Sequence, residues 1–140
     1  MSGPQAELHD LIRNTLKANA GVMSLVTEVY DAIPKGNWKE PEAYISFGPT
    51  DVVDDDAECI TGGLYTVQID CWSREVGSYY CKEIVDAVKA ALHDIDAELP
   101  THGLTQMRVV ARRVFADPDG KTMHGVVAVE ALIEEDVETV

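Results

Sequence analysis

The stretch GLYTVQIDCW, residues 63–72, alternates apolar and polar side chains along most of its length. The apolar positions are Tyr65, Val67, Ile69 and Cys71, and the positions between them are Thr66, Gln68, Asp70 and Trp72. Because successive side chains of a β-strand point to opposite faces of a sheet, this period of two predicts a strand with one buried face. Such a sheet needs other elements packed on that face, and the neighbouring segments supply them.

Two helices are predicted, one on each side of this strand. An apolar stripe with helical spacing follows the strand, and ELPTHG at residues 98–103 ends it. The stripe consists of Cys81, Ile84, Val85, Val88, Ala91, Leu92 and Ile95. Its N-cap is either Ser73 or Ser78, and the sequence does not decide between them. The other helix covers residues 5–18, where leucine and isoleucine recur at helical spacing after Pro4.

Further strands are predicted at residues 43–48 and in two segments rich in β-branched residues, 104–116 and 121–135. The last two segments flank the turn sequence DPDG, so we expect them to form a hairpin. The order helix, strands, helix, hairpin predicts a single α+β domain over residues 1–140. In this domain, two helices pack on one face of a small, largely antiparallel β-sheet that ends in the hairpin.

The hairpin sequence FADPDGKTMHG, residues 115–125, gathers two Asp and one His and therefore resembles a metal site. An EF-hand loop also contains D-x-D-G, but it needs a Glu at its twelfth position, and counting from Asp117 that position is Ala128. His124 is expected roughly opposite Arg113, an unfavourable neighbour for a bound cation. We therefore interpret the centre of this segment as a structural type I turn. Its four residues are Asp117, Pro118, Asp119 and Gly120.

No catalytic constellation is recognised in the chain. His93 and Asp96 have i, i+3 spacing but make an incomplete metal set, and TGG at residues 61–63 lacks the lysine of a phosphate loop. Cys59, Cys71 and Cys81 do not have the spacing of a zinc site and are interpreted as reduced cysteines. The sequence therefore predicts no metal, no cofactor and no enzymatic activity.

Acidic residues dominate the charge, and the net charge is −14. Such a chain is unsuited to wrapping nucleic acid, whose phosphates need Lys and Arg. Two stretches, residues 51–58 and 130–138, are rich in acids and contain no base. We expect an acidic mobile loop, or a strand edge, at about residues 49–60 and an acidic tail at about residues 134–140. No apolar run approaches the roughly 20 residues that cross a bilayer, so we expect no membrane partner.

Several short segments follow the order seen in one family of phage proteins. They are VYDAIP (29–34), P-x-A-Y-I-S-F-G (41–48), CWSRE-x-G (71–77), AALHD (90–94) and R-V-x-x-DPDG-x-T-x-HG (113–125). As an ordered set they resemble the tail terminator, or tail completion, proteins of siphophages, which also occur in prophages and gene transfer agents. The resemblance covers roughly residues 5–133.

This resemblance implies a structural virion protein, with helices against a small β-sheet and no enzymatic activity. Members of the family form a six-fold ring on the end of the finished tail tube, where the ring stops tube polymerisation and presents a surface for head joining. The implied partners are other copies of the chain, the major tail tube protein and a head-completion or neck protein. The resemblance also implies that DNA passes through the ring without specific binding. The implied location is the head-proximal end of the virion tail, after assembly in the host cytoplasm.

Aromatic and basic residues are candidates for the contacts of such a ring, because interface centres favour aromatics and Arg. The candidates for subunit or tube contacts are Trp38, Trp72, Arg74, Arg108, Arg112 and Arg113. Burial against the following helix is the alternative for Trp72, a local lid over the core for Trp38, and a solvated sheet face for the arginines of residues 108–113. A ring uses head-to-tail contacts, so we expect this basic strand to meet an acidic surface of the next copy, such as the acidic tail.

The acidic residues Asp54, Asp55 and Asp56 are expected to face the lumen of the ring, because an acidic lumen repels DNA phosphates and leaves the duplex free to slide. A position on the outer rim is the alternative. Three other functions are compatible with the sequence: a head-side connector or adaptor of the neck, an acidic immunity- or decoy-type protein that masks a basic partner, and a small enzyme.

Overall fold

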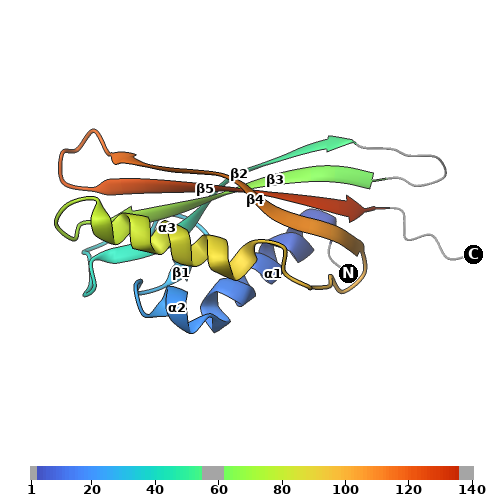
Figure 1. The fold of residues 1–140 in the computed structure, drawn as a ribbon, viewed down its shortest axis with the longest axis horizontal. Coiled ribbons are helices and arrows are strands. Elements are labelled where there is room, and N and C mark those ends of the chain that lie inside the picture. Colours follow the sequence, from blue (N-terminus) through green and yellow to red (C-terminus); the bar gives the residue numbers. More distant parts are fainter. Residues whose placement is uncertain (1–2, 55–61, 136–140) are drawn as a thin grey trace, which may run out of the picture.

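The computed structural model describes residues 3–54 and 62–135. The described helices are α1 (Pro4–Ala18), α2 (Ala20–Met23) and α3 (Tyr79–Leu92). The described strands are β1 (Val29–Tyr30), β2 (Ala43–Asp54), β3 (Gly62–Ser73), β4 (Gly103–Ala116) and β5 (Met123–Glu134). The helices lie together on one side of the sheet, and no described helix covers its other face (Figure 1). The predicted α+β class is therefore confirmed, with the short α2 added to the two expected helices.

The described strands form one sheet in the order β1-β2-β3-β5-β4. β1 runs parallel to β2, and every other neighbouring pair is antiparallel, so the sheet is largely antiparallel as predicted. β3, the strand expected from the alternation at residues 63–72, is central and pairs with both β2 and β5. β4 and β5 form the expected hairpin around residues 117–120.

The core lies between the sheet and the helices. The apolar positions of β3 are all buried, and so are the residues that the two helical stripes turn toward them. Those residues include Leu8, Ile12 and Leu16 of α1 and Cys81, Ile84 and Val88 of α3. Burial raises the pKa of the Cys81 thiol to about 11 and also raises that of Cys71, so both remain protonated core thiols. No described helix is long and apolar enough to cross a membrane.

The end of α3 differs from the sequence-based expectation. The helix follows Ser78 as N-cap, whose side chain makes no capping hydrogen bond, and it ends at Leu92 instead of continuing toward residues 98–103. Asp94 adopts a φ of 54°, which the helix cannot continue through, and its backbone N–H donates to the carbonyl of Met107 at 2.9 Å. The chain therefore leaves the helix early in order to join β4.

The length of β2 also differs from the expectation. Residues 49–54 belong to the strand, because Thr50–Asp54 pair in register with β3 from Val67 to Gly63. The prediction of a mobile loop at about 49–60 is therefore wrong for residues 49–54. The alternative prediction, a strand at the edge of the sheet, is confirmed there. The remainder of that segment lies outside the described residues, as does most of the acidic tail.

A buried carboxylate ties α1 to the connection between α3 and β4. Glu7 is 4% exposed, accepts hydrogen bonds from the backbone N–H and the hydroxyl of Thr101, and lies 2.9 Å from Nδ1 of His102. Burial opposes ionisation of Glu7, but the hydrogen bonds from Thr101 and His102 outweigh it, so the pKa of Glu7 is lowered. This network fixes the N-terminal helix to the sheet connection.

Candidate functional site

A row of rings crosses the helix-free face of the sheet, with one ring from each described strand. We call it the aromatic row, and it consists of Tyr30 of β1, Tyr44 of β2, Trp72 of β3, His124 of β5 and Phe115 of β4. Adjacent ring centroids are 5.6, 6.4, 3.9 and 4.8 Å apart in that order. The register produces this row, because Trp72 lies opposite both Tyr44 and His124. Phe115 lies opposite His124 on the next strand.

Polar side chains hold the centre of the aromatic row. Nε2 of His124 lies 2.7 Å from Oδ1 of Asp70, and the Gln68 amide donates to the same oxygen at 2.9 Å. The Trp72 indole donates to Oγ of Ser46 at 2.9 Å and stacks on the His124 ring at an interplanar angle of 12°. Asp70 and Ser46 are buried beneath the rings. Both rings are therefore fixed by hydrogen bonds as well as by stacking.

These positions correct two expectations from the sequence. His124 lies opposite Phe115, not Arg113, whose register partner is Val126. Trp72 does not bury against the following helix, because α3 packs on the other face of the sheet (Figure 1). Trp72 is consequently available for a surface role.

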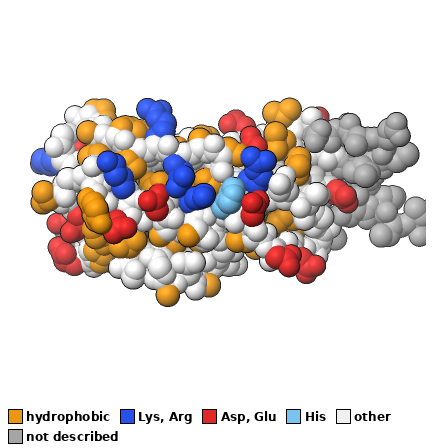
Figure 2. Space-filling model, in the orientation of Figure 1, with side chains coloured by type: hydrophobic (Ala, Val, Ile, Leu, Met, Phe, Trp, Pro, Cys, Tyr) orange, Lys and Arg blue, Asp and Glu red, His pale blue; other side chains and the backbone are white. Residues whose placement is uncertain are grey.

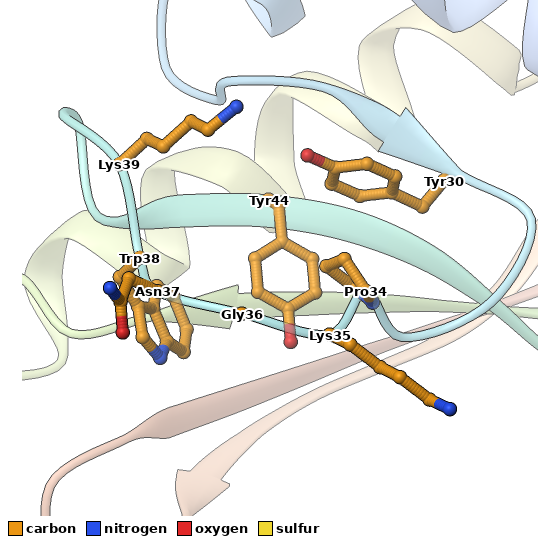
Figure 3. Close-up of a pocket in the computed structure, with 8 residues that line it drawn as sticks. All are labelled: Tyr30, Pro34, Lys35, Gly36, Asn37, Trp38, Lys39 and Tyr44. Atoms are coloured by element: carbon orange, nitrogen blue, oxygen red, sulfur yellow. The ribbon is translucent and has the colours of Figure 1, made fainter.

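Trp38 and Arg74 lie beside Tyr44, near the β1 end of the aromatic row. The Trp38 ring centroid is 4.9 Å from that of Tyr44, and the Arg74 guanidinium lies 4.7 Å from the Trp38 ring centroid. A pocket of about 210 Å³ opens here, with the rings of Trp38, Tyr44 and Tyr30 around it (Figure 3). In this view the Lys39 side chain lies above Tyr44 and the Lys35 side chain below it (Figure 3). Trp38 thus extends the aromatic surface of the sheet and is not a lid over the core.

The residues 117–120 form the expected turn. The Gly120 N–H donates to the Asp117 carbonyl at 3.1 Å, and Gly120 has a φ of 74°, which favours glycine. The Asp119 carboxylate accepts from the Thr122 hydroxyl at 2.7 Å and from the Lys121 N–H at 2.8 Å. Both oxygens of Asp119 are thereby used within the turn. Among the described residues, no group of three His, Cys, Asp or Glu side chains is placed to hold a metal ion.

The Asp119 hydrogen bonds make the turn sensitive to acid. The bonds from the Thr122 hydroxyl and from the backbone N–H groups of Lys121 and Thr122 lower the pKa of Asp119 from 3.8 to about 2. The resulting stabilisation is complete above the unfolded pKa and is lost as the pH falls through the folded pKa. We expect wild type to be more stable than Asp119→Asn by a constant margin from pH 7 to near pH 4, with the margin shrinking toward pH 2. Thermal melts of both proteins measure this margin, and a margin unchanged at pH 2 contradicts the assignment.

Three of the four candidate arginines lie on β4, but on both of its faces. Arg113 stands over the Phe115 ring, 5.0 Å from its centroid, and Arg108 lies opposite Glu130. Arg112 points to the helix side and pairs with Asp86 of α3 at 3.0 Å. A groove of about 410 Å³ between α3 and β4 is lined in part by Arg112 and Arg113. Figure 2 shows Lys and Arg side chains in a row over β4 and the neighbouring helix.

The candidate acidic residues are only partly described. Asp54 is exposed at the end of β2, whereas Asp55 and Asp56 lie outside the described residues. Asp51, three residues earlier, is exposed on the same strand. The described structure therefore gives an acidic end to β2 and a basic stretch to β4, at opposite sides of β3 and β5.

Comparison with known proteins identifies the family. The model of the family described as Tail completion protein gp17 matches residues 10–134. A chain in the solved virion of a native gene transfer agent (GTA) particle is 26% identical, with a TM-score of 0.80 over 94% of this chain and 95% of that chain. No curated protein matches the chain. The resemblance indicated by the ordered motifs is thus confirmed, and the chain belongs to the tail completion protein gp17 family of phage tail structural proteins.

Proposed function

We propose that this chain forms a six-fold ring on the end of the tail tube, where the ring stops tube polymerisation and offers a surface for joining the head. The family match and the similarity to a virion chain support a role in the tail. In this proposal the partners are other copies of the chain, the major tail tube protein and a neck protein. The ring sits at the head-proximal end of the tail, after assembly in the host cytoplasm, and uses no catalytic step or cofactor.

The main observation in support of the proposed ring is that unlike charges lie on separate surfaces of one chain. The exposed Arg112 and Arg113 lie on β4, and the exposed Asp51 lies on β2, with two strands between them. Two different and complementary surfaces favour head-to-tail contacts, which close into a ring when the rotation between copies permits it. Identical self-complementary patches, which favour two-fold dimers, need no such separation.

Charge reversal at the basic surface tests the ring. Arg112→Glu with Arg113→Glu is expected to leave the monomer folded but to prevent ring formation on purified tail tubes. The control is Lys17→Glu with Lys121→Glu, which makes the same change in net charge at two positions outside β4. Wild-type ring formation is expected to weaken with salt, because exposed charges are screened beyond about 8–10 Å near physiological ionic strength. Negative-stain images of the tube ends and thermal melts of the free proteins provide the readouts.

Normal rings from the double variant contradict the role of Arg112 and Arg113. The location is tested separately by labelling the tagged protein on complete particles. A label at the upper end of tails that lack heads supports a tail-capping ring. A label found on tailless heads instead indicates a connector of the neck.

We further propose that Asp54, Asp55 and Asp56 face the lumen of the ring. Asp54 ends β2 in an exposed position, and the acids that follow it in the sequence have no basic neighbour there. An acidic lumen repels phosphates and lets the duplex slide. Changing all three to Lys is expected to leave tails intact and to slow DNA delivery. Unchanged delivery contradicts the lumen position, and loss of head joining indicates a partner-binding segment.

A further inference from the structure

Two edges of the sheet have no further partner strand within the described residues. β4 is the last strand on one side. On the other side, β1 pairs only with Ile45 and Ser46 of β2. Among the described residues, residues 47–54 of β2 therefore have a neighbouring strand on one side only, which is β3. We call residues 50–54 the free half of β2. An unpaired strand edge presents a row of backbone donors and acceptors, which is a template for pairing with another chain.

Both edges are also exposed on their two faces. Residues 49–54 of β2 are exposed one after another, and Val53 is 64% exposed. Residues 110–113 of β4 form a second continuous exposed run, and Val110 is 40% exposed. In a strand that packs on a core, alternate residues are buried. These two runs, each with an exposed valine, therefore have the character of surfaces that become buried in an assembly.

The charges and the strand directions both indicate that the strand pairing with each edge belongs to a second copy of this chain. The free half of β2 carries the exposed Asp51, and the exposed run of β4 carries Arg112 and Arg113. The pairing pattern makes β4 antiparallel to β2 within one sheet. A neighbour in the same orientation therefore presents its β2 antiparallel to β4 of the first copy, in the ladder geometry of an antiparallel sheet.

We infer that neighbouring copies join edge to edge, with β4 of one copy pairing antiparallel with the free half of β2 of the next. This inference rests on the proposed ring and names its subunit contact. The contact joins unlike edges, so each copy keeps one β4 and one β2 edge for its two neighbours, as head-to-tail assembly requires. The sheets of successive copies then continue into one another around the ring.

The alternation of side chains restricts the register of this contact. Arg113 and Asp51 both point to the helix-free face, because their partners Val126 and Thr66 lie on that face. When like faces align, a register that places Arg113 opposite Asp51 also places Ala111 opposite Val53. The pairing stops before Pro49, which has no N–H to donate and lies within the irregularity between Phe47 and Thr50.

A charge swap tests the contact without disturbing the core. Arg113→Glu alone and Asp51→Arg alone are each expected to reduce the number of rings on purified tail tubes, because each places like charges opposite one another. The two changes together are expected to restore rings toward the wild-type number. Lys121→Glu with Asp51→Arg is the matched control, and it is expected to show no restoration. Failure of the Arg113→Glu and Asp51→Arg combination to restore rings contradicts the register.

Cross-linking tests the pairing of the edges directly. Cys59→Ser supplies the background, since Cys71 and Cys81 are buried. In that background, Val53→Cys with Ala111→Cys is treated with a short bis-maleimide after ring formation on tubes. A ladder of covalent oligomers on a denaturing gel is expected from the double variant, and no ladder beyond the dimer from either single variant. Rings that assemble normally but yield no ladder overturn the edge pairing while the ring itself stands. Absence of wild-type rings from tubes contradicts the proposed function instead.

Discussion

Gly125→Ala is expected to lower the free energy of unfolding by about 2–3 kcal/mol, because the sheet and α3 approach too closely at this point for a side chain. A Cβ atom on Gly125 would lie 2.5 Å from Cγ2 of Val85 and 3.1 Å from Sγ of Cys81. Both neighbours belong to the buried face of α3, and neither atom is the end of a long flexible side chain. The helix therefore has to move away from the sheet, and part of the core packing is lost with it.

Urea denaturation of wild type, Gly125→Ala and Gly103→Ala measures this cost. Gly103 is the matched control, because its added methyl meets only the Glu134 side chain, at 3.2 Å or more. Both changes reduce the freedom of the unfolded chain alike, so their difference reports the crowding. Val85→Ala in the Gly125→Ala background is expected to recover part of the loss. Equal stability of the two single glycine variants would show that α3 is not held this close to β5.

Ile69→Ala is expected to lower the free energy of unfolding by about 2–5 kcal/mol, the usual range for truncating a buried isoleucine. Ile69 lies on the central strand β3 with no exposed surface, in the cluster that joins α1 and α3 to the sheet. Removal of three carbon atoms there leaves a cavity that the strands on both sides of β3 prevent from closing. We therefore expect the loss of stability to lie in the upper part of this range.

Thr66→Ala on the same strand is the control for Ile69→Ala. Thr66 is half-buried on the helix-free face, so its truncation opens no cavity in the core. We expect its effect to stay within about 1 kcal/mol, as is typical of substitutions away from a core. Denaturant midpoints and slopes of both variants provide the comparison. Similar losses from the two positions would contradict the assignment of the two faces of β3.

The main elements were predictable because their signals are local. The alternation at residues 63–72 and the stripes of α1 and α3 each lie within one stretch of chain, and the buried faces they predict are the ones in the core. The free half of β2 gave no such signal, since a strand exposed on both faces has no alternation of apolar residues. It is a strand because its backbone pairs with β3, and no pattern of residue types in the sequence reveals that pairing.

The register of the hairpin was wrong by two residues for a specific reason. Centring the hairpin on DPDG places His124 opposite Arg113. In the structure, the Asp119 carboxylate draws in the backbone N–H groups of Lys121 and Thr122, and the ladder begins only beyond Thr122. The turn therefore consumes two further residues on its C-terminal side, and His124 moves opposite Phe115.

The aromatic row was beyond the reach of the sequence for a related reason. Trp72 was singled out, but Tyr44 and Phe115 had no individual signal. Their proximity follows from three strand registers together, and an error of two residues in one of them removes the row. Three of the candidate arginines were correctly grouped on one strand. Arg112 and Arg113 point to opposite faces of β4, as adjacent residues of a strand do, and the irregularity between Val109 and Ala111 places Arg108 on the face of Arg113. The Glu7 and His102 contact joins positions too distant in the sequence to be paired by pattern.

The position of both tryptophans on the helix-free side gives the protein an intrinsic optical label. Trp38 and Trp72 are the tryptophans of the chain, and each is half-buried beside the aromatic row. Fluorescence excited at the red edge of protein absorption therefore arises from this one surface, with no background from indoles in the core. An emission change on mixing with tail tubes, unaccompanied by a change in circular dichroism, reports contact at that surface without any attached dye.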